Sequence, residues 1–238
     1  IFTALTTLFL AFITPNIAEA SHVAAGDAVL TQVDTFNALR YEVTLRFYRE
    51  SKGVGAPVAI TPRLFSPCFG FVNLTAFGDF VDTANGLGGG TVKGSNCILD
   101  DDKKTTEEYL YRSVIDLPGK CDSWTLFWQV TARPPNDNLT GSPTFHVETS
   151  WDNTDINSWD PSFGTDPNLA LRYVPNVYWN NTPVFNNNEP VQSFCVGREY
   201  QFDLSATDLD GDSLSYRISP ALSGFGEQVT YAPGFTGN

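Results

Sequence analysis

The sequence contains no methionine, very little histidine and few basic residues, and these scarcities exclude whole classes of function. Its 14 lysines and arginines stand against 27 aspartates and glutamates, which gives a formal net charge of −13 over 238 residues. Nucleic-acid binding requires clustered Lys and Arg that neutralise phosphates, so we expect no nucleic-acid partner. The acidic balance fits a soluble surface protein and also fits calcium binding.

Zinc binding and nucleophilic catalysis find little support. The four cysteines lie far apart, no CxxC motif occurs, and His22 and His146 are the only histidines. A zinc site needs a closer set of Cys and His ligands. Neither histidine neighbours a nucleophile elbow or a metal motif, and no spacing singles out a pair of glycosidase carboxylates. We therefore predict a protein that is not an enzyme.

Long apolar runs are absent after residue 20, whereas one opens the chain. Residues 1–13 are apolar and uncharged, and Ala18-Glu19-Ala20 is the small-x-small pattern of a cleavage site. We interpret residues 1–20 as a signal peptide that lacks its start; the alternative is a buried N-terminal strand or helix. Export predicts a secreted or extracellular cell-surface location, with no membrane span in the mature segment.

Export also makes disulfides possible for Cys68, Cys97, Cys121 and Cys195. Four cysteines allow three pairings, and the sequence alone does not choose among them. We predict the pair Cys97–Cys121, because the segment between them contains an evident strand and a short turn. Cys68 and Cys195 would then pair with each other or stay free.

Apolar residues alternate with polar ones along much of the chain, and no segment has a 3.6-residue apolar stripe. The period of two predicts strands at 41–48, 109–116, 124–131, 202–206 and 214–218. Clusters of Gly, Pro, Asn and Asp separate these segments. The pattern predicts an all-β chain of antiparallel β-sandwich domains in tandem, with almost no helix after residue 20.

A polar, proline-bearing stretch at 175–190 predicts a domain boundary. The first β-sandwich domain is predicted over residues 21–178, and the second over residues 179–238. Residues 179–238 contain only a few predicted strands, which are not enough to close a sandwich. We therefore expect this segment to be the incomplete start of a domain.

Short motifs along the chain carry a family resemblance. They are Ser21-His22-Val23, the strand 41–49, Leu-Pro-Gly-Lys-Cys-Asp-Ser-Trp at 117–124, Asn-Thr-Pro-Val-Phe at 181–185, the Asp-rich run 205–216, and 229–235. Together they resemble the N-terminal region of large secreted bacterial surface proteins of the gliding-motility-associated or PKD type, with a cadherin-like second module. The family often has Cys-Cys-Arg-Asn after the Trp strand, where this chain has Thr-Ala-Arg-Pro, so the family disulfide pattern does not carry over. The resemblance implies an Ig/cadherin-like, non-enzymatic surface or adhesion protein.

The run Asp-Leu-Asp-Gly-Asp at 208–212 is a candidate calcium site. Alternate side chains of an extended or turning backbone point the same way, so Asp208, Asp210 and Asp212 can converge. Calcium takes roughly six to eight oxygen ligands, including Asn carbonyls. Asn180 and Asn181 resemble the cadherin linker at which calcium stiffens adjacent domains, although Asn replaces the linker carboxylate. We predict these five as ligands; the alternative is an Asp-Gly turn that needs no metal.

The tryptophans divide into two groups. Trp124 and Trp128 share a strand face and are predicted to be core. Trp151, Trp159 and Trp179 lie in Asn-, Asp- and Pro-rich sequence, where their rings can stack on sugars or cap the ends of a sandwich.

The leading functional hypothesis is a non-catalytic extracellular structural or adhesion module of a larger cell-surface or secreted protein, with calcium stiffening its domain joint. Its expected partners are other surface proteins or extracellular polysaccharide. The alternative is a carbohydrate-binding module of a secreted hydrolase system, which would display loop tryptophans in one plane. A third hypothesis, a secreted hydrolase, requires a concave pocket with convergent acid and base groups.

Overall fold

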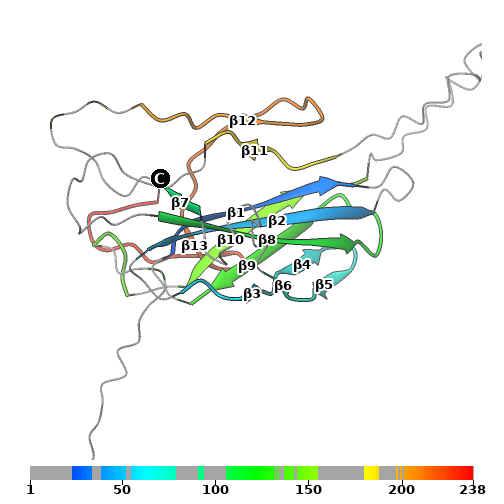
Figure 1. Cartoon of the computed structure of the whole chain (residues 1–238), viewed down its shortest axis with the longest axis horizontal. Helices are drawn as coiled ribbons and strands as arrows, with labels where there is room; N and C mark the ends of the chain where they lie inside the picture. The colour runs from blue at the N-terminus through cyan, green and yellow to red at the C-terminus, as the bar shows by residue number, and fades with distance from the viewer. Residues whose placement is uncertain are drawn as a thin grey trace, which may run out of the picture.

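The computed structural model describes residues 23–33, 39–51, 55–78, 91–93, 106–131, 133, 137–141, 144–154, 180–187, 197, 199 and 201–237. Every helix or strand within these ranges is a β-strand, so the predicted all-β class is confirmed (Figure 1). The described ranges accordingly hold no helix that is long and apolar enough to cross a membrane. Residues 1–20 and His22 lie outside the described residues.

The first sheet is antiparallel and contains two of the predicted strands at its centre. Its order is β1 (Val23–Gln32), β2 (Arg40–Glu50), β8 (Thr106–Asp116) and β7 (Thr91–Lys93). The alternation predicted at 41–48 and 109–116 forms the long β2–β8 pair, in which Leu45 lies opposite Tyr111. Both side chains are fully buried, because the inward face of each strand carries the apolar set.

The second sheet is also antiparallel and includes the predicted strand at 124–131. Its order is β14 (Glu227–Gln228), β13 (Leu222–Gly224), β10 (Phe145–Trp151), β9 (Trp124–Val130), β4 (Arg63–Ser66) and β5 (Gly70–Asn73). Two short pairs complete the described strands, namely β3 (Ala59–Ile60) with β6 (Phe77–Gly78), and β11 (Val184–Phe185) with β12 (Ala206–Thr207).

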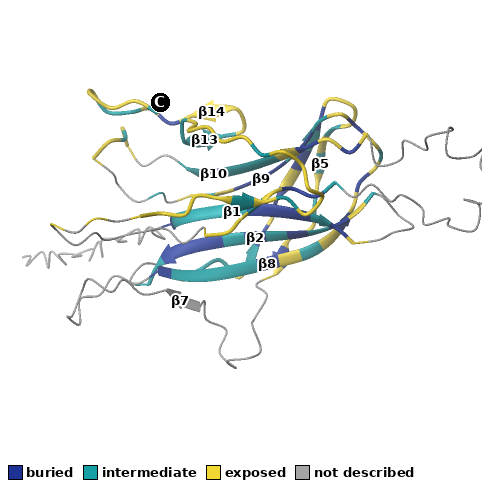
Figure 2. Ribbon diagram, turned by 90° about the horizontal axis from the view of Figure 1, so that it is seen from above, coloured by how far each residue is buried: buried dark blue, intermediate teal, exposed yellow. Residues whose placement is uncertain are grey.

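One apolar core lies between the two sheets. Alternate residues of β2 and of β9 supply it, among them Val43, Leu45, Trp124, Leu126 and Trp128. Figure 2 shows buried residues along β1, β2 and β9. Trp124 and Trp128 are therefore core residues, as their shared strand face predicts. The large rings of Phe47 and Trp128 contact each other across the core, with centroids 6.2 Å apart.

The chain passes unusually close to this core at Gly26 in β1. A Cβ atom at this position would lie 2.6 Å from the ring of Trp128. Real Cβ atoms do not approach so closely, and the buried ring has no room to retreat. Glycine at position 26 therefore lets β1 lie directly against the ring of a β9 residue.

A disulfide joins Cys68 to Cys121, with an S–S distance of 2.09 Å and Cα atoms 6.0 Å apart. The predicted pair Cys97–Cys121 is therefore wrong in this structure. Cys68 lies in the turn between β4 and β5, and β4 pairs with β9, whose start follows Cys121 closely. Sheet pairing thus brings together two cysteines that are distant in sequence. Cys97 and Cys195 lie outside the described residues.

Two predicted strands do not form as expected. The segment 202–206 contributes only its last residue to β12, and 214–218 contains no strand. Most of their large apolar side chains are exposed, with Leu204 71% and Ile218 87% accessible, whereas Leu214 is half-buried. Period-two alternation needs a pairing strand before it becomes a ladder, and the described residues offer these segments only the short β11.

The C-terminal hairpin β13–β14 adds to the second sheet. Leu222 in β13 lies opposite His146 in β10, and Phe225 at the hairpin tip packs on Phe127 with ring centroids 4.8 Å apart. A bridge between Leu139 and Tyr231 continues the contact. The boundary near residue 178 stays a prediction, but strands from both sides of it share one sheet.

Candidate functional site

The linker, residues 180–185, is anchored on the outer edge of β1. The amide N–H of Thr182 donates to the carbonyl of Leu30 at 3.0 Å, and the Leu30 N–H donates to Thr182 Oγ1 at 2.9 Å. The Gln32 N–H donates to Asn181 Oδ1 at 2.7 Å. Asn181 and Thr182 are both buried. Direct hydrogen bonds thus fix the path of the chain as it leaves the two sheets.

Asn181 also binds the turn at 208–212. Its main-chain N–H donates to Asp210 Oδ2 at 2.6 Å, and its side-chain Nδ2 donates to Asp210 Oδ1 at 2.8 Å. Its remaining side-chain oxygen accepts from Gln32. One residue therefore connects β1 to the Asp-rich turn. We call this set of contacts among Gln32, Asn181 and Asp210 the joint.

The Asp-rich run forms the turn that was the alternative to a metal site. Asp208 Oδ1 accepts the N–H groups of Asp210 at 2.9 Å and of Asp212 at 3.1 Å. Gly211 has a φ of 85°, in the left-handed region that glycine adopts readily. The side chain of Asp208 thus holds the turn, as Asx turns do.

The predicted convergence of three carboxylates is not present. The oxygens of Asp208, Asp210 and Asp212 do not all lie within 4.8 Å of one another. The reason is that the Asp208 carboxylate accepts main-chain N–H groups of its own turn, whereas the Asp210 carboxylate points toward the donors of Asn181. The side-chain Nδ2 of Asn180 donates instead to the carbonyl of Asp152. Calcium binding itself stays a prediction.

Electrostatics at the joint favour added positive charge. Burial raises the pKa of the Asp210 carboxyl, the two donors of Asn181 lower it, and the charges of Asp208 and Asp212 raise it again. A raised pKa means that the ionised carboxylate is less favourable here than in water. A proton or a cation beside Asp210 would relieve that cost.

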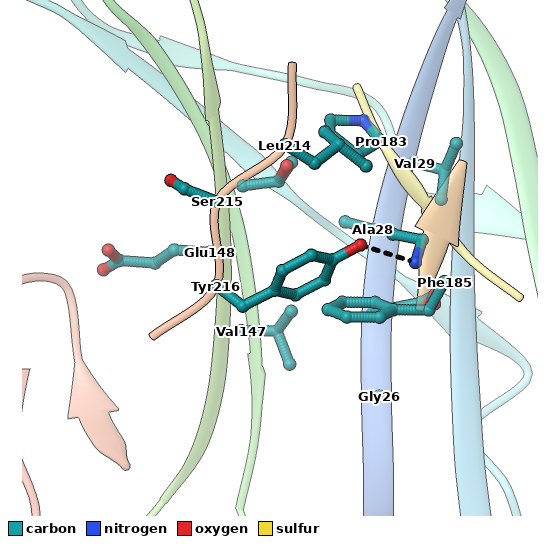
Figure 3. Close-up of a pocket in the computed structure, with 13 residues that line it drawn as sticks. Gly26, Ala28, Val29, Val147, Glu148, Pro183, Phe185, Leu214, Ser215 and Tyr216 are labelled. Carbon is teal, nitrogen blue, oxygen red and sulfur yellow. Dashed lines mark hydrogen bonds between the residues drawn. The ribbon is translucent and has the colours of Figure 1, made fainter. Parts of the chain in front are cut away.

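A pocket of about 340 Å³ lies between β1 and β10, where Pro183 and Phe185 of the linker help to line it (Figure 3). Its described lining consists of Gly26, Asp27, Ala28, Val29, Val147, Glu148, Thr149, Pro183, Phe185, Ala206, Leu214, Ser215 and Tyr216. The side chains that face it are mainly apolar. The hydroxyl of Tyr216 accepts the Ala206 N–H at 2.9 Å, which fixes the ring across the pocket.

The tryptophans predicted to stack on sugars have different outcomes. Trp151 is only 7% accessible and packs between Trp124 and Tyr41, with ring centroids 6.4 and 5.9 Å away. Its ring belongs to the end of the core, which was the alternative interpretation. Trp159 and Trp179 lie outside the described residues.

The fold also determines the surroundings of His146 and of two cysteines, Cys68 and Cys121. His146 is buried on β10, stacks on Phe127, and its Nε2 lies 2.8 Å from Glu148 Oε1. Among the described residues, the one group of three possible metal ligands is Cys68, Cys121 and Asp122. Its two sulfurs are bonded to each other, so they supply no thiolate to a metal.

Sequence reasoning missed Thr182 and the pocket. Thr182 precedes Pro183, which has no N–H and cannot extend a ladder. The Thr182-Pro183 pair was therefore the signal in the sequence: Thr182 can still pair with a strand edge, and the pairing must end at Pro183. The pocket had no local signal, because its walls come from distant parts of the chain. Comparison with protein-family models, curated proteins and solved structures found no match to this chain.

Proposed function

We propose that this chain is a non-catalytic extracellular structural or adhesion module of a larger cell-surface or secreted protein. The observation that carries the proposal is the joint, in which Asn181 binds β1 with its side-chain oxygen and Asp210 with its two N–H groups. Successive domains move freely unless something fixes them. A linker bonded on both sides suits a protein whose task is to hold a shape.

The architecture supports a β-sandwich of the Ig/cadherin-like kind. Two antiparallel sheets share one apolar core, which is how such sandwiches bury their inner faces. The Cys68–Cys121 disulfide supports export, because disulfides persist in oxidising compartments. The family resemblance of the sequence motifs points to the same class of surface protein.

Calcium at the joint is the finer part of this proposal. Burial first, and then the charges of Asp208 and Asp212, raise the pKa of Asp210, so its ionised carboxylate is less favourable here than in water. A hard divalent cation prefers such oxygen ligands. Binding would require these carboxylates to turn toward the ion. The expected partners remain other surface proteins or extracellular polysaccharide.

Limited proteolysis with a broad-specificity protease tests the joint. Asn181→Ala removes the two hydrogen bonds of the side chain and leaves the main-chain N–H bond to Asp210, so cleavage between residues 183 and 205 should accelerate by about tenfold or more. Asn180→Ala is the matched control, because it removes the hydrogen bond that the Asn180 side chain donates to the carbonyl of Asp152 and leaves the Asn181 contacts in place. Equal cleavage rates for the two variants would show that the joint does not hold the linker.

A further inference from the structure

The end of the core beneath the joint contains a buried carboxamide. The inward positions of β1 include Ala28 and Leu30, and Gln32 follows them where the alternation predicts another apolar residue. Gln32 is only 2% exposed. Neither its Nε2 nor its Oε1 has a hydrogen-bond partner among the described residues. A carboxamide buried in this way is unfavourable unless another molecule satisfies its polar atoms.

Two aromatic side chains bring further polar atoms to the same end of the core. Tyr41 lies directly opposite Gln32 in the β1–β2 pair, so the two side chains point to the same face of the sheet. Trp151, from β10 in the other sheet, packs on Tyr41 with ring centroids 5.9 Å apart. The Tyr41 hydroxyl and Trp151 Nε1 are also buried, and neither forms a hydrogen bond with any residue that the structure describes. Strands β1, β2 and β10 thus each contribute an unsatisfied polar group next to Tyr41.

The Tyr41 hydroxyl interacts with its polar neighbours without bonding to them directly. Burial raises the pKa of Tyr41 to about 12, the N–H of Trp151 lowers it, and the charge of Asp210 raises it. Trp151 and Asp210 both act on the hydroxyl, yet no hydrogen bond joins it to either of them. Polar groups that interact across such a gap are commonly bridged by water.

The mixture of donors and acceptors defines the molecule that fits between these groups. Trp151 Nε1 and Gln32 Nε2 only donate, Gln32 Oε1 only accepts, and the Tyr41 hydroxyl can do either. A cation is disfavoured, because it would meet the positive ends of two N–H groups. Water both donates and accepts, and buried waters typically form about three hydrogen bonds to otherwise unsatisfied groups.

We propose that an ordered water molecule binds at this end of the core and joins the two sheets beneath the linker. It accepts a hydrogen bond from Trp151 Nε1 and bonds to the Gln32 carboxamide and the Tyr41 hydroxyl. Gln32 contacts Asn181 through its main-chain N–H and uses its side chain for the water, so the water site and the joint share no atom of Gln32. The inference goes beyond the proposed structural role and does not depend on it.

NMR cross-relaxation between water and the isotope-labelled native chain tests the proposal. A long-lived buried water should give a cross-peak with the Trp151 indole N–H. The indole of Trp128 is the matched control and should give none, because it is also buried but its ring contacts Phe47 and Phe145, which offer no acceptor. Tyr41→Phe removes a hydroxyl whose exchange with solvent could imitate the cross-peak, and the cross-peak should persist in that variant.

Gln32→Met tests the carboxamide. The variant keeps the length of the side chain and removes both polar atoms, whereas the main-chain bond to Asn181 remains. The Trp151 cross-peak should weaken severalfold. The equilibrium constant for folding should fall by about tenfold, because Tyr41 and Trp151 lose the partner that Gln32 helps to hold.

Three results would overturn the proposal: no Trp151 cross-peak in the native chain, its loss in Tyr41→Phe, or a higher folding constant for Gln32→Met, which would show a carboxamide without a partner. Loss of the cross-peak on addition of calcium would overturn it as well and assign the site to the ion. The proteolysis of Asn181→Ala is scored separately, so failure of the water site and failure of the joint are distinguishable.

Discussion

The two-sheet region, residues 23–154, and the linker region, residues 180–237, bury opposite kinds of side chain. In the two-sheet region the large aromatic and aliphatic residues are inside. In the linker region most of the large apolar residues of the predicted strands are exposed, whereas Asn181 and Thr182 are buried. Among its described apolar residues, Val229 alone is buried. The two-sheet region is thus held by apolar packing. Residues 180–218 are attached to it by hydrogen bonds, and the hairpin β13–β14 is attached by its pairing with β10 and by the contact of Phe225 with Phe127.

This difference has energetic consequences. Apolar burial is non-directional and large in total, so the two-sheet region should unfold as a unit. A net hydrogen bond contributes only about 1 kcal/mol, so the linker region should open locally at much lower cost. Each of the following changes should affect one region and spare the other.

The largest effect is expected from Trp128→Ala in the core. Trp128 is almost fully buried between the sheets and contacts Phe47 and Phe145. Its removal should lower the free energy of unfolding by about 3–5 kcal/mol, measured by chemical denaturation. Ile218→Ala in the linker region is the control and should change it by less than about 0.5 kcal/mol. Similar losses for both would contradict the comparison.

Loss of the disulfide should be the next largest effect. Replacing both Cys68 and Cys121 with Ser removes a cross-link between residues 53 positions apart, and stability should fall by about 2–5 kcal/mol. Adding reductant should destabilise the native chain similarly and leave the double variant unaffected. Peptide mapping that recovers Cys121 bonded to Cys97 would refute the assignment.

Calcium should stabilise the linker region alone. At a few millimolar ion, extracellular-type affinity predicts about 1–2 kcal/mol of added local stability, seen as slower hydrogen exchange at 208–212. Asp208→Ala combined with Asp210→Ala should abolish the effect, and exchange in β2 should not respond. Unchanged exchange at 208–212 would leave these carboxylates with their hydrogen bonds in the turn and to Asn181, and without a calcium ion.

A smaller effect is expected on the alkaline side from Tyr41. Burial raises its pKa to about 12, so the unfolded chain ionises this group first. Its stabilising contribution is complete below pH 10 and is lost as pH rises toward 12, by about 1 kcal/mol at pH 11. Denaturation of Tyr41→Phe across this range should show a shallower decline. An identical decline in both proteins would contradict the shifted pKa.

The sequence predicted the elements whose two faces differ strongly. Strands β2, β8 and β9 alternate cleanly because one face of each enters the core. The same alternation failed at 202–206 and 214–218, since it reports amphipathic character and not whether a pairing strand exists. Cysteine pairing failed for a related reason: the contact that sets it, β4 with β9, is non-local.

The candidate site was predicted in part. Asn181 and Asp210 were expected to lie together, and the structure brings them together. They meet as donor and acceptor instead of as ligands of one ion, because an amide can present either its nitrogen or its oxygen. Residue spacing indicates proximity, whereas the direction of an amide depends on its neighbours, here the Gln32 N–H.

The pairing of β10 with β13 also bears on how the molecule is assembled. A chain synthesised from its N-terminus can complete β1, β2 and β8 while residues 222–228 are still absent, so β10 exposes an unpaired edge until those residues are made. Contacts of such wide sequence separation form slowly, and open edges are where chains aggregate. The hairpin is therefore a late closing step, and its timing sets the interval during which the nascent protein is vulnerable.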